Sequence, residues 1–186
     1  GVLYARQGIP LTNIIEGGAQ ERGKRAGTEN VPGIMGLAAA LKEACDHIDE
    51  NAAKVSNLRD QLIAGLSQIP HSALNGDPVH RLPGNVNFCF EGIEGESLLL
   101  LLDQAGICAS SGSACTSGSL DPSHVLLAIG RPHEVAHGSL RLSLCEWNTQ
   151  EDVDHILKEV PRIVAYLRSM SPVWKDLASG KKQFML

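Results

Sequence analysis

Apolar residues follow two different periods along this chain, and this mixture constrains the fold more than any other feature of the sequence. Between residues 34 and 66, and again between 153 and 167, they recur every three or four positions, which predicts long helices. Between residues 85 and 90, and between 139 and 145, they alternate with polar residues, which predicts half-buried strands. Helices and strands intermingled in this way indicate an α/β or α+β fold.

Capping signals mark where the main helices begin. Asn30 followed by Pro32 predicts the start of the first helix, and Thr149 with Asp152 predicts the start of the last one. Pro161 is expected to kink this last helix. The remaining expectations, in chain order, are a strand over residues 1–6, a helix break near 49–51, a turn at 75–78, a helix over 94–104, a short strand over 106–109 and a helix over 122–129 closed by Gly130.

Composition excludes several classes of protein. A net charge of −5 without a long basic run argues against nucleic-acid binding. The longest apolar run, residues 98–102, is far too short to cross a membrane. Five cysteines without a C-x-x-C pair favour a reducing, cytoplasmic location over a disulfide framework. Because Gly1 opens an apparent strand without an initiator methionine, we expect the chain to be a piece of a longer protein.

Residues 133–137, HEVAH, match the H-E-x-x-H pattern of zinc proteases. That pattern requires a helix, on which two histidines one turn apart converge on one metal ion. Helix-breaking residues flank the motif on both sides, at 130–132 and at Gly138, and leave no room for two stable turns. We therefore predict an ordinary connecting segment and no metal site here.

Two residues remain as candidates for chemistry, Cys115 and Arg141. Cys115 lies in SSGSACTSGS (110–119), which is either a flexible linker or the carrier of a nucleophilic thiolate that needs a nearby cation or helix N-terminus. Arg141 is either a solvated side chain on a strand or a bidentate clamp for a carboxylate. The glycine-rich stretch 17–28, with Thr28, offers backbone N–H groups to an anion, although it matches no P-loop spacing.

Three segments together resemble a known family. GGAQERGKRAGTENVPGI (17–34), SSGSACTSGSLDPSHVLLAIG (110–130) and the AHGSLRLSL strand (136–144) look like the C-terminal half of a NifS/IscS-type cysteine desulfurase. These enzymes are class V aminotransferases with the fold-type I architecture of pyridoxal-phosphate enzymes. The resemblance covers essentially the whole chain. It implies that residues 1–35 end the large cofactor domain and its dimer-facing loop, and that residues 36–186 form the small C-terminal domain with the cysteine loop.

The resemblance also implies roles for individual residues. The Cys115 thiolate would attack the sulfur of L-cysteine, with pyridoxal 5'-phosphate as electron sink, giving L-alanine and a persulfide on Cys115. That sulfur would pass to an iron–sulfur cluster scaffold protein. In some relatives the matching cysteine also helps to hold a nascent [2Fe–2S] cluster, and no other metal is expected. Arg141 would grip the substrate carboxylate, and Thr28 would reach the cofactor phosphate of the other subunit of a homodimer.

One departure from the family limits what this chain can do by itself. The family's Schiff-base lysine lies in a Ser-x-His-Lys motif that no lysine of this sequence matches, so we expect the cofactor anchor outside the chain and no turnover by the chain alone. Ala19, where relatives often have glycine, is expected to be tolerated. The alternative hypothesis is a free-standing sulfur carrier that accepts a persulfide on Cys115. Nitrogenase maturation, general cluster assembly and tRNA thiolation, with sulfur or selenium, all remain open.

Overall fold

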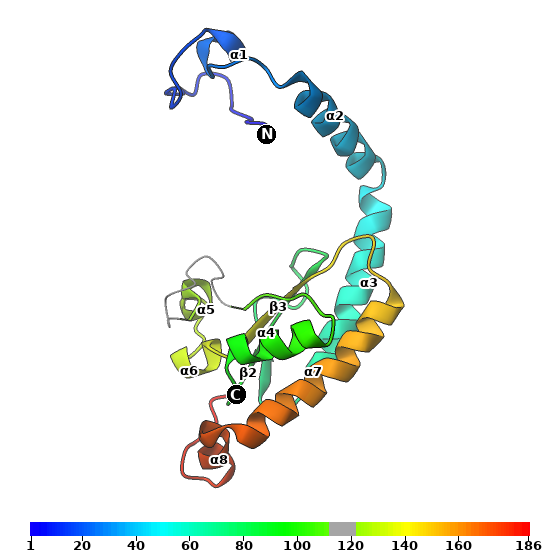
Figure 1. Cartoon of the computed structure of the whole chain (residues 1–186), viewed down its shortest axis with the longest axis vertical. Coiled ribbons are helices and arrows are strands. Elements are labelled where there is room, and N and C mark those ends of the chain that lie inside the picture. The colour runs from blue at the N-terminus through cyan, green and yellow to red at the C-terminus, as the bar shows by residue number, and fades with distance from the viewer. Residues whose placement is uncertain (112–121) are drawn as a thin grey trace. The chain divides into compact units, whose positions relative to one another are not determined.

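The computed structural model describes residues 1–111 and 122–186 (Figure 1). By contacts the chain divides into two compact units, Gly1–Ile48 and Asp49–Leu186. The division expected after residue 35 concerns the domains of a longer enzyme and stays a prediction. The described elements are α1 (Gln20–Gly23), α2 (Val31–Asp46), α3 (Ile48–Leu66), β1 (Ser72–Leu74), β2 (Asn85–Phe90), α4 (Gly95–Gln104), α5 (His124–Ala128), α6 (His133–Ala136), β3 (Ser139–Ser143), α7 (Gln150–Met170) and α8 (Pro172–Ala178).

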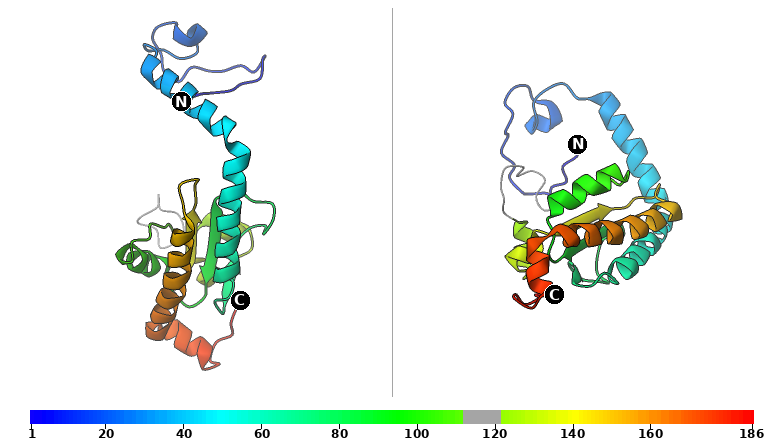
Figure 2. Two further views of the ribbon diagram at one scale, coloured as in Figure 1. Left: turned by 90° about the vertical axis from the view of Figure 1, so that its right-hand side faces the viewer. Right: turned by 60° about the horizontal axis from the view of Figure 1, so that its bottom comes forward.

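A three-stranded antiparallel sheet, in the order β1-β2-β3, organises the second unit. The register places Phe88 opposite Leu140 and Asn87 opposite Arg141. Because side chains alternate between the two faces of a strand, one face of the sheet is apolar and the other is polar. Helices α3, α4 and α7 gather on the apolar face, as Figures 1 and 2 show. The core there contains Leu58, Leu62, Leu66, Val86, Phe88, Phe90, Leu98, Leu102, Leu140, Leu142, Val153, Val160, Ile163 and Val164.

Among the described residues, helices cover the polar face at one end only. Cys89, which points to this face, packs with Leu126 of α5 and with Val135 and Ala136 of α6 in a small second core. Toward the other end of the strands lie Asn87, half-buried on β2, and the exposed Arg141 on β3. This polar end, over which no described helix lies, has the composition of a binding surface.

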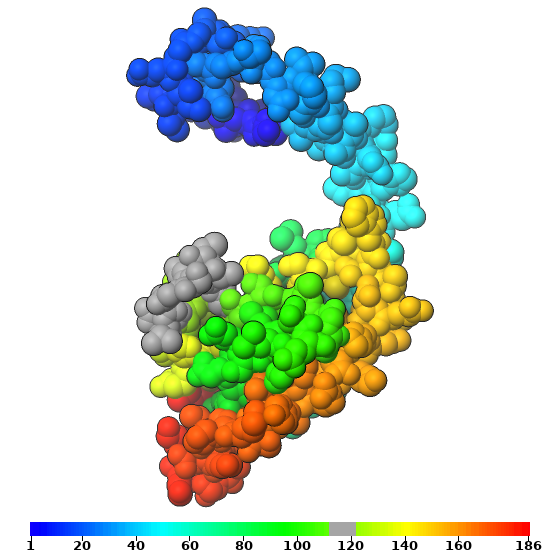
Figure 3. All heavy atoms as spheres, in the orientation of Figure 1, coloured from blue at the N-terminus to red at the C-terminus, as the bar shows by residue number. Residues whose placement is uncertain are grey.

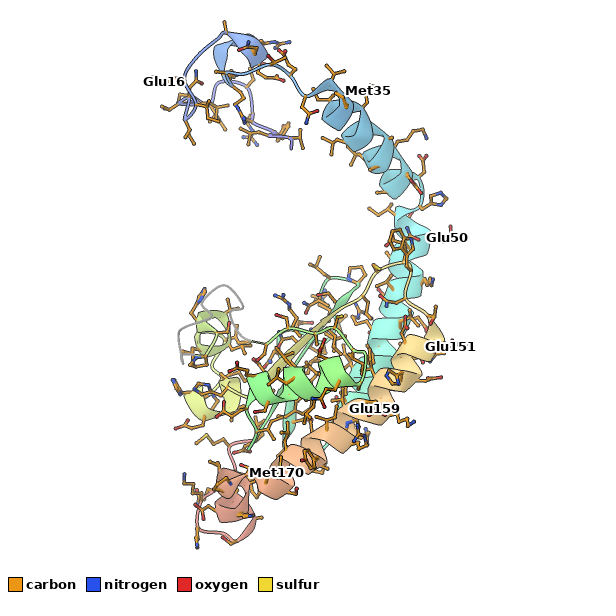
Figure 4. All side chains as sticks on the ribbon, in the orientation of Figure 1. Glu16, Met35, Glu50, Glu151, Glu159 and Met170 are labelled. Atoms are coloured by element: carbon orange, nitrogen blue, oxygen red, sulfur yellow. The ribbon has the colours of Figure 1, made fainter. Side chains whose placement is uncertain are left out.

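Helix α7 begins as the sequence predicts. The Thr149 hydroxyl accepts a hydrogen bond from the N–H of Asp152, and the Asp152 carboxylate accepts one from the N–H of Thr149 at 3.0 Å. The backbone and side-chain hydrogen bonds to this carboxylate, from Thr149 and then Asn148, hold the pKa of Asp152 below its usual value. The helix continues through Pro161 to Met170, and Figure 4 marks Glu159 and Met170 along it.

Buried charged groups hold the C-terminal residues in place within the second unit. The carboxylate of Glu91 accepts hydrogen bonds from the N–H groups of Met185 (2.8 Å) and Leu186 (3.3 Å). The Arg168 guanidinium donates to the carbonyl oxygens of Glu91, Pro70 and His71 and lies 4.0 Å from the centre of the Trp174 ring. Burial lowers the pKa of Arg168 to about 10. In Figure 3 this C-terminal part, in red, lies against the end of α7.

The first unit has almost no core of its own. Ala26 is its buried apolar residue, and the 16 residues of α2 include none that is buried. Asn30 caps α2 as predicted, because its side chain accepts the N–H of Gly33 at 3.0 Å. Figure 4 shows Met35 projecting from this helix. The exposed apolar residues of the unit include Val2, Leu3, Tyr4, Ile9, Ile14, Val31, Ile34, Met35 and Leu41.

Several sequence predictions are wrong in detail. Residues 1–6 form no strand, because no described strand lies beside them to take their backbone hydrogen bonds. Residues 106–109 are not a strand either, and pairing begins only with a single bridge at Ser110. The helix break falls at His47, and the HEVAH segment contains the helical turn α6 where we expected none. The short β1 and α8 were not predicted, nor was the turn α1 in the glycine-rich stretch.

Candidate functional site

Arg141 is joined through its backbone to the start of the cysteine-containing segment. Its N–H donates to the carbonyl of Ser110 at 2.6 Å, and its own carbonyl accepts the N–H of Ser110 at 3.1 Å. Cys115 lies outside the described residues. The structure therefore brings the predicted carboxylate clamp next to the first residue of SSGSACTSGS, five positions before the predicted nucleophile.

Close packing fixes the upstream end of this segment. The Ser111 and Ser139 hydroxyl oxygens lie 3.3 Å apart, within hydrogen-bond distance. Gly95, at the start of α4, donates its N–H to the carbonyl of His137 at 2.9 Å. A Cβ atom on Gly95 would lie 2.1 Å from the Ser111 hydroxyl oxygen, so no larger residue fits there without displacement. Glycine at position 95 thus allows α4, β3 and residue 111 to meet.

The downstream end is also held on the sheet. Pro122 and Ser123 are buried, and Leu126 of α5 enters the small core around Cys89. After α5 the chain turns at Gly130, whose φ is +88°, and Arg131 then reaches across to the sheet. Both described ends of the segment are therefore anchored, one beside β3 and the other through the loop that follows α5.

The guanidinium of Arg141 is available for a ligand. The side chain is exposed, and it makes no ion pair and no hydrogen bond with another described residue. Arg168 is the opposite case, since burial and three carbonyl acceptors already occupy its donors. A free guanidinium in the middle of a strand is suited to bind a carboxylate with two parallel hydrogen bonds.

Sequence reasoning missed three residues that are linked in a row leading to Arg141, namely Arg131, Asn75 and Asn87. Arg131 donates from Nε to Oδ1 of Asn75 at 2.7 Å, and Nδ2 of Asn75 donates to Oδ1 of Asn87 at 2.7 Å. Asn75 is 4% exposed. Asn87 stands directly opposite Arg141 in the sheet. The alternation in NVNFCF (85–90) predicts that Asn87 lies on the polar face of its strand. Only the register of β2 against β3 identifies Asn87 as the neighbour of Arg141.

Cys89 is excluded as a nucleophile by its surroundings. Its side chain is fully buried, and Asn75 Nδ2 lies 3.2 Å from its sulfur. Burial raises the pKa of the Cys89 thiol, and the Asn75 hydrogen bond only partly offsets this. The thiol therefore stays protonated and unreactive near neutral pH.

Thr28 lies in the first unit, in a loop that closes on itself. The side-chain oxygen Oε1 of Gln20 accepts the N–H of Gly27 at 3.1 Å, and Gly27 has a φ of +101°. Thr28 follows, exposed, and neither its N–H nor its hydroxyl bonds to another described residue. Ala19 has a φ of −90°, a conformation open to any L residue, which supports its expected tolerance.

The HEVAH motif does not form a metal site among the described residues. Helix α6 has only four residues, and the rings of His133 and His137 meet edge to face with centroids 4.7 Å apart. Nowhere in residues 1–111 and 122–186 do three or more metal-binding side chains converge. The same ranges contain no helix with the length and apolar character needed to span a bilayer.

Comparison with known proteins identifies the family. The model of the aminotransferase class-V family matches residues 14–156, well over half of the sequence. The chain belongs to the class-V aminotransferase family. This confirms the family resemblance and, with it, the predicted fold class.

Similar proteins within this family include cysteine desulfurases. The chain is 55% identical over 186 residues to cysteine desulfurase IscS of Clostridium botulinum, covering 98% of this chain and 47% of that protein. It is 51% identical over 175 residues to cysteine desulfurase NifS of Azotobacter vinelandii, covering 94% and 44%. A solved structure of a NifS-like protein matches with a TM-score of 0.78 at 37% identity, over 88% of this chain and 42% of that one. The chain thus spans less than half the length of these relatives.

Proposed function

We propose that the chain is the C-terminal part of a cysteine desulfurase, which removes sulfur from L-cysteine and leaves L-alanine. One observation supports this most strongly. The side chain of Arg141 is exposed and unpaired among the described residues, and its backbone is bridged to Ser110, where the cysteine-containing segment begins. L-Cysteine bound through its carboxylate at Arg141 would lie close to Ser110, and Cys115 follows Ser110 by only five positions. The names of the similar proteins support the same reaction.

Arg141 binds the carboxylate of L-cysteine in this proposal. A guanidinium presents two parallel N–H donors, which match the two oxygens of a carboxylate, and it stays charged at every physiological pH. Position 141 on a strand holds the side chain more rigidly than a loop would, because the backbone of Arg141 is hydrogen-bonded to Ser110. Arg141 orients the substrate and takes no part in bond breaking.

Cys115 performs the sulfur transfer in this proposal. Its thiolate forms a bond to the substrate sulfur while the carbon–sulfur bond of L-cysteine breaks. The sulfur stays on Cys115 as a persulfide, and the carbon takes the electron pair and a proton to become L-alanine. Thiolate chemistry of this kind needs a low thiol pKa and access to the substrate. The evidence for Cys115 is the sequence around it, since the residue lies outside the described ranges.

The residues present suit the phosphate group of pyridoxal phosphate. Thr28 offers a hydroxyl and an N–H that no described residue uses, directly after the glycine-supported turn at Gly27. Two such donors are what a phosphate oxygen accepts. When bound, the cofactor supplies the electron sink that stabilises negative charge on the substrate carbon. The anchoring lysine, the homodimer that would share the phosphate, and the boundary between residues 35 and 36 belong to the same proposal.

An iron–sulfur cluster scaffold protein is the proposed sulfur acceptor, in the cytoplasm. The persulfide would pass to a thiol of that protein, and Cys115 would act as a transient ligand of a nascent [2Fe–2S] cluster. Names of similar proteins support the family of reactions only, so the acceptor rests on the resemblance. Proteins that act in tRNA thiolation are the alternative acceptors.

The test uses the full-length protein that contains this chain, loaded with pyridoxal phosphate. Incubation with L-cysteine should give L-alanine and a mass increase of one sulfur atom on the peptide containing Cys115. The Cys115→Ala variant should lose both, while Cys145→Ala, which removes another exposed thiol, should keep both. Full alanine production by Cys115→Ala in the presence of an acceptor would refute the mechanism.

A second candidate function is favoured by the complete core of the second unit, residues 49–186. In this alternative, the chain accepts sulfur on Cys115 and passes it on without producing it. Mixing the purified chain with a persulfide donor, without pyridoxal phosphate, should then add one sulfur atom to Cys115. An unchanged mass would leave only the desulfurase proposal.

A further inference from the structure

A row of polar residues crosses the open end of the sheet beside Arg141. Asn75 follows β1, Asn87 lies on β2 and Arg141 on β3, with Ser110 bridged to the outer side of Arg141. The carbonyl of Asn87 accepts the N–H of Asn75 at 2.8 Å, so its backbone groups point toward β1. Those of Arg141 point the other way, toward Ser110. Asn87 and Arg141 are therefore a non-hydrogen-bonded pair, the kind in which opposite side chains come closest.

The hydrogen bonds in this row fix the orientation of the side-chain amides of Asn75 and Asn87, that is, which partner faces the oxygen and which faces the nitrogen. An arginine side chain can only donate, so the Nε of Arg131 obliges Asn75 to present its oxygen, at 2.7 Å. The Nδ2 group of Asn75 then faces Asn87, which must accept with its own oxygen, again at 2.7 Å. Asn87 is left with its Nδ2 donor, for which none of the described residues provides an acceptor.

We propose that Asn87 is a substrate-binding residue, which donates from Nδ2 to the same carboxylate that Arg141 binds. This inference rests on the proposed function, because it takes that carboxylate to be the one of L-cysteine. Two donors side by side, with no acceptor between them, select a ligand that only accepts, and an ionised carboxylate is such a ligand. Arg131 and Asn75 are positioning residues that act through Asn87.

The other charged groups on this face agree with an anionic ligand. Arg81 donates to the carbonyl oxygen of Asn75 and to Oδ1 of Asn85, and Arg131 also donates to the carbonyl of Leu74 at 2.5 Å. Both guanidinium groups are thus used for structure, and both add positive charge beside the row. Asp77, two positions after Asn75, accepts the N–H groups of Val79 and His80.

Asn85 provides a matched control. It lies on the same strand and face, and an arginine fixes its amide oxygen in the same way, but its partner across the sheet is Ser143 rather than Arg141. If lost stability or lost surface polarity weakens substrate binding, Asn85→Ala and Asn87→Ala should weaken it to the same extent. An effect of substrate contact should appear in Asn87→Ala alone.

The experiment measures steady-state kinetics of the full-length protein with pyridoxal phosphate bound. Asn87→Ala should raise the KM for L-cysteine about tenfold, which corresponds to about 1.4 kcal/mol and to one charge-assisted hydrogen bond. The inhibition constant of L-alanine, which keeps the carboxylate but has no sulfur, should rise by the same factor. Asn87→Asp keeps the acceptor toward Asn75 but puts a negative charge beside the substrate, and should raise both constants further. Asn85→Ala should change neither by more than about twofold.

A double-mutant cycle tests the positioning role of Asn75. Asn75→Asp still accepts from Arg131 but can no longer donate to Asn87, so the Asn87 amide turns its donor inward. Alone, this change should raise the KM about as much as Asn87→Ala does, about tenfold. In the Asn87→Ala background it should add nothing, because its target is absent. A merely structural role would show the same loss in both backgrounds.

The outcomes separate this inference from the function on which it rests. If the parent protein makes no L-alanine from L-cysteine, the proposed function fails and this inference fails with it. If the parent makes L-alanine but Asn87→Ala and Asn87→Asp, both folded by circular dichroism, match Asn85→Ala in both constants, the desulfurase proposal stands and the role of Asn87 is refuted.

Discussion

The two faces of the β1-β2-β3 sheet consist of neighbouring residues on the same strands, yet they have opposite properties. Phe88 and Leu140 face each other in the core, each 1% exposed. At the adjacent position of each strand, Asn87 and Arg141 face each other on the polar side. Alternation thus places a core residue and a polar residue at adjacent positions of each strand. Substitutions on the two faces should therefore change different measured quantities.

The largest expected effect belongs to the core face. Phe88→Ala should lower the free energy of unfolding of the chain by about 3–5 kcal/mol, because it removes a fully buried aromatic ring and leaves a cavity. Urea denaturation followed by circular dichroism measures the change. Phe88 lies among helices that meet on the sheet, so the surroundings have little freedom to fill the gap.

The neighbouring substitution on the other face serves as the control. Asn87→Ala should cost far less stability than Phe88→Ala, because Asn87 is only half-buried. If both variants lost the same free energy of unfolding, the separation between the two faces would be wrong.

Much of this fold follows from the sequence because its signals are local. The alternation in β2 and β3 and the capping residues of α2 and α7 all predict structure from adjacent positions. The three-residue strand β1 is too short to show a period, and it exists because β2 offers an edge. Residues 1–6 show the converse case, since apolar residues without a neighbouring strand do not form one.

The site was predictable only where a single residue carried the signal. Arg141 is identifiable because a charged residue interrupts an apolar strand. Asn87 needs the register of β2 against β3, and its amide orientation depends on Arg131, 44 positions later in the sequence. Contacts between residues so far apart depend on packing of α5 and the sheet, which no local pattern encodes.

A smaller loss is expected for a substitution at Gly138, which directly precedes β3. A Cβ atom there would lie 2.1 Å from the carbonyl oxygen of Phe90, which is backbone and cannot turn aside. Gly138→Ala should therefore lower the free energy of unfolding by about 1–3 kcal/mol, as overpacking usually does. Urea denaturation of the variant and parent chains measures this change in the free energy of unfolding.

Gly36 is the matched control for this substitution. It lies within α2, and a Cβ atom there would meet nothing within 4 Å. Gly36→Ala should leave stability unchanged or raise it by up to about 1 kcal/mol, since alanine favours the helix. A loss from Gly36→Ala equal to that from Gly138→Ala would refute the steric explanation.

The smallest effect on stability is expected for Arg141→Lys, on the open face. Arg141 is exposed and unpaired among the described residues, so the free energy of unfolding should change by less than about 0.5 kcal/mol. Binding should respond differently, because a lysine ammonium cannot form the bidentate pair with a carboxylate. The KM for L-cysteine in the full-length protein should rise about tenfold or more, with a smaller change in kcat. Unchanged kinetics would remove Arg141 from the site, whereas a large loss of stability would mean that the open face contributes to folding as the core face does.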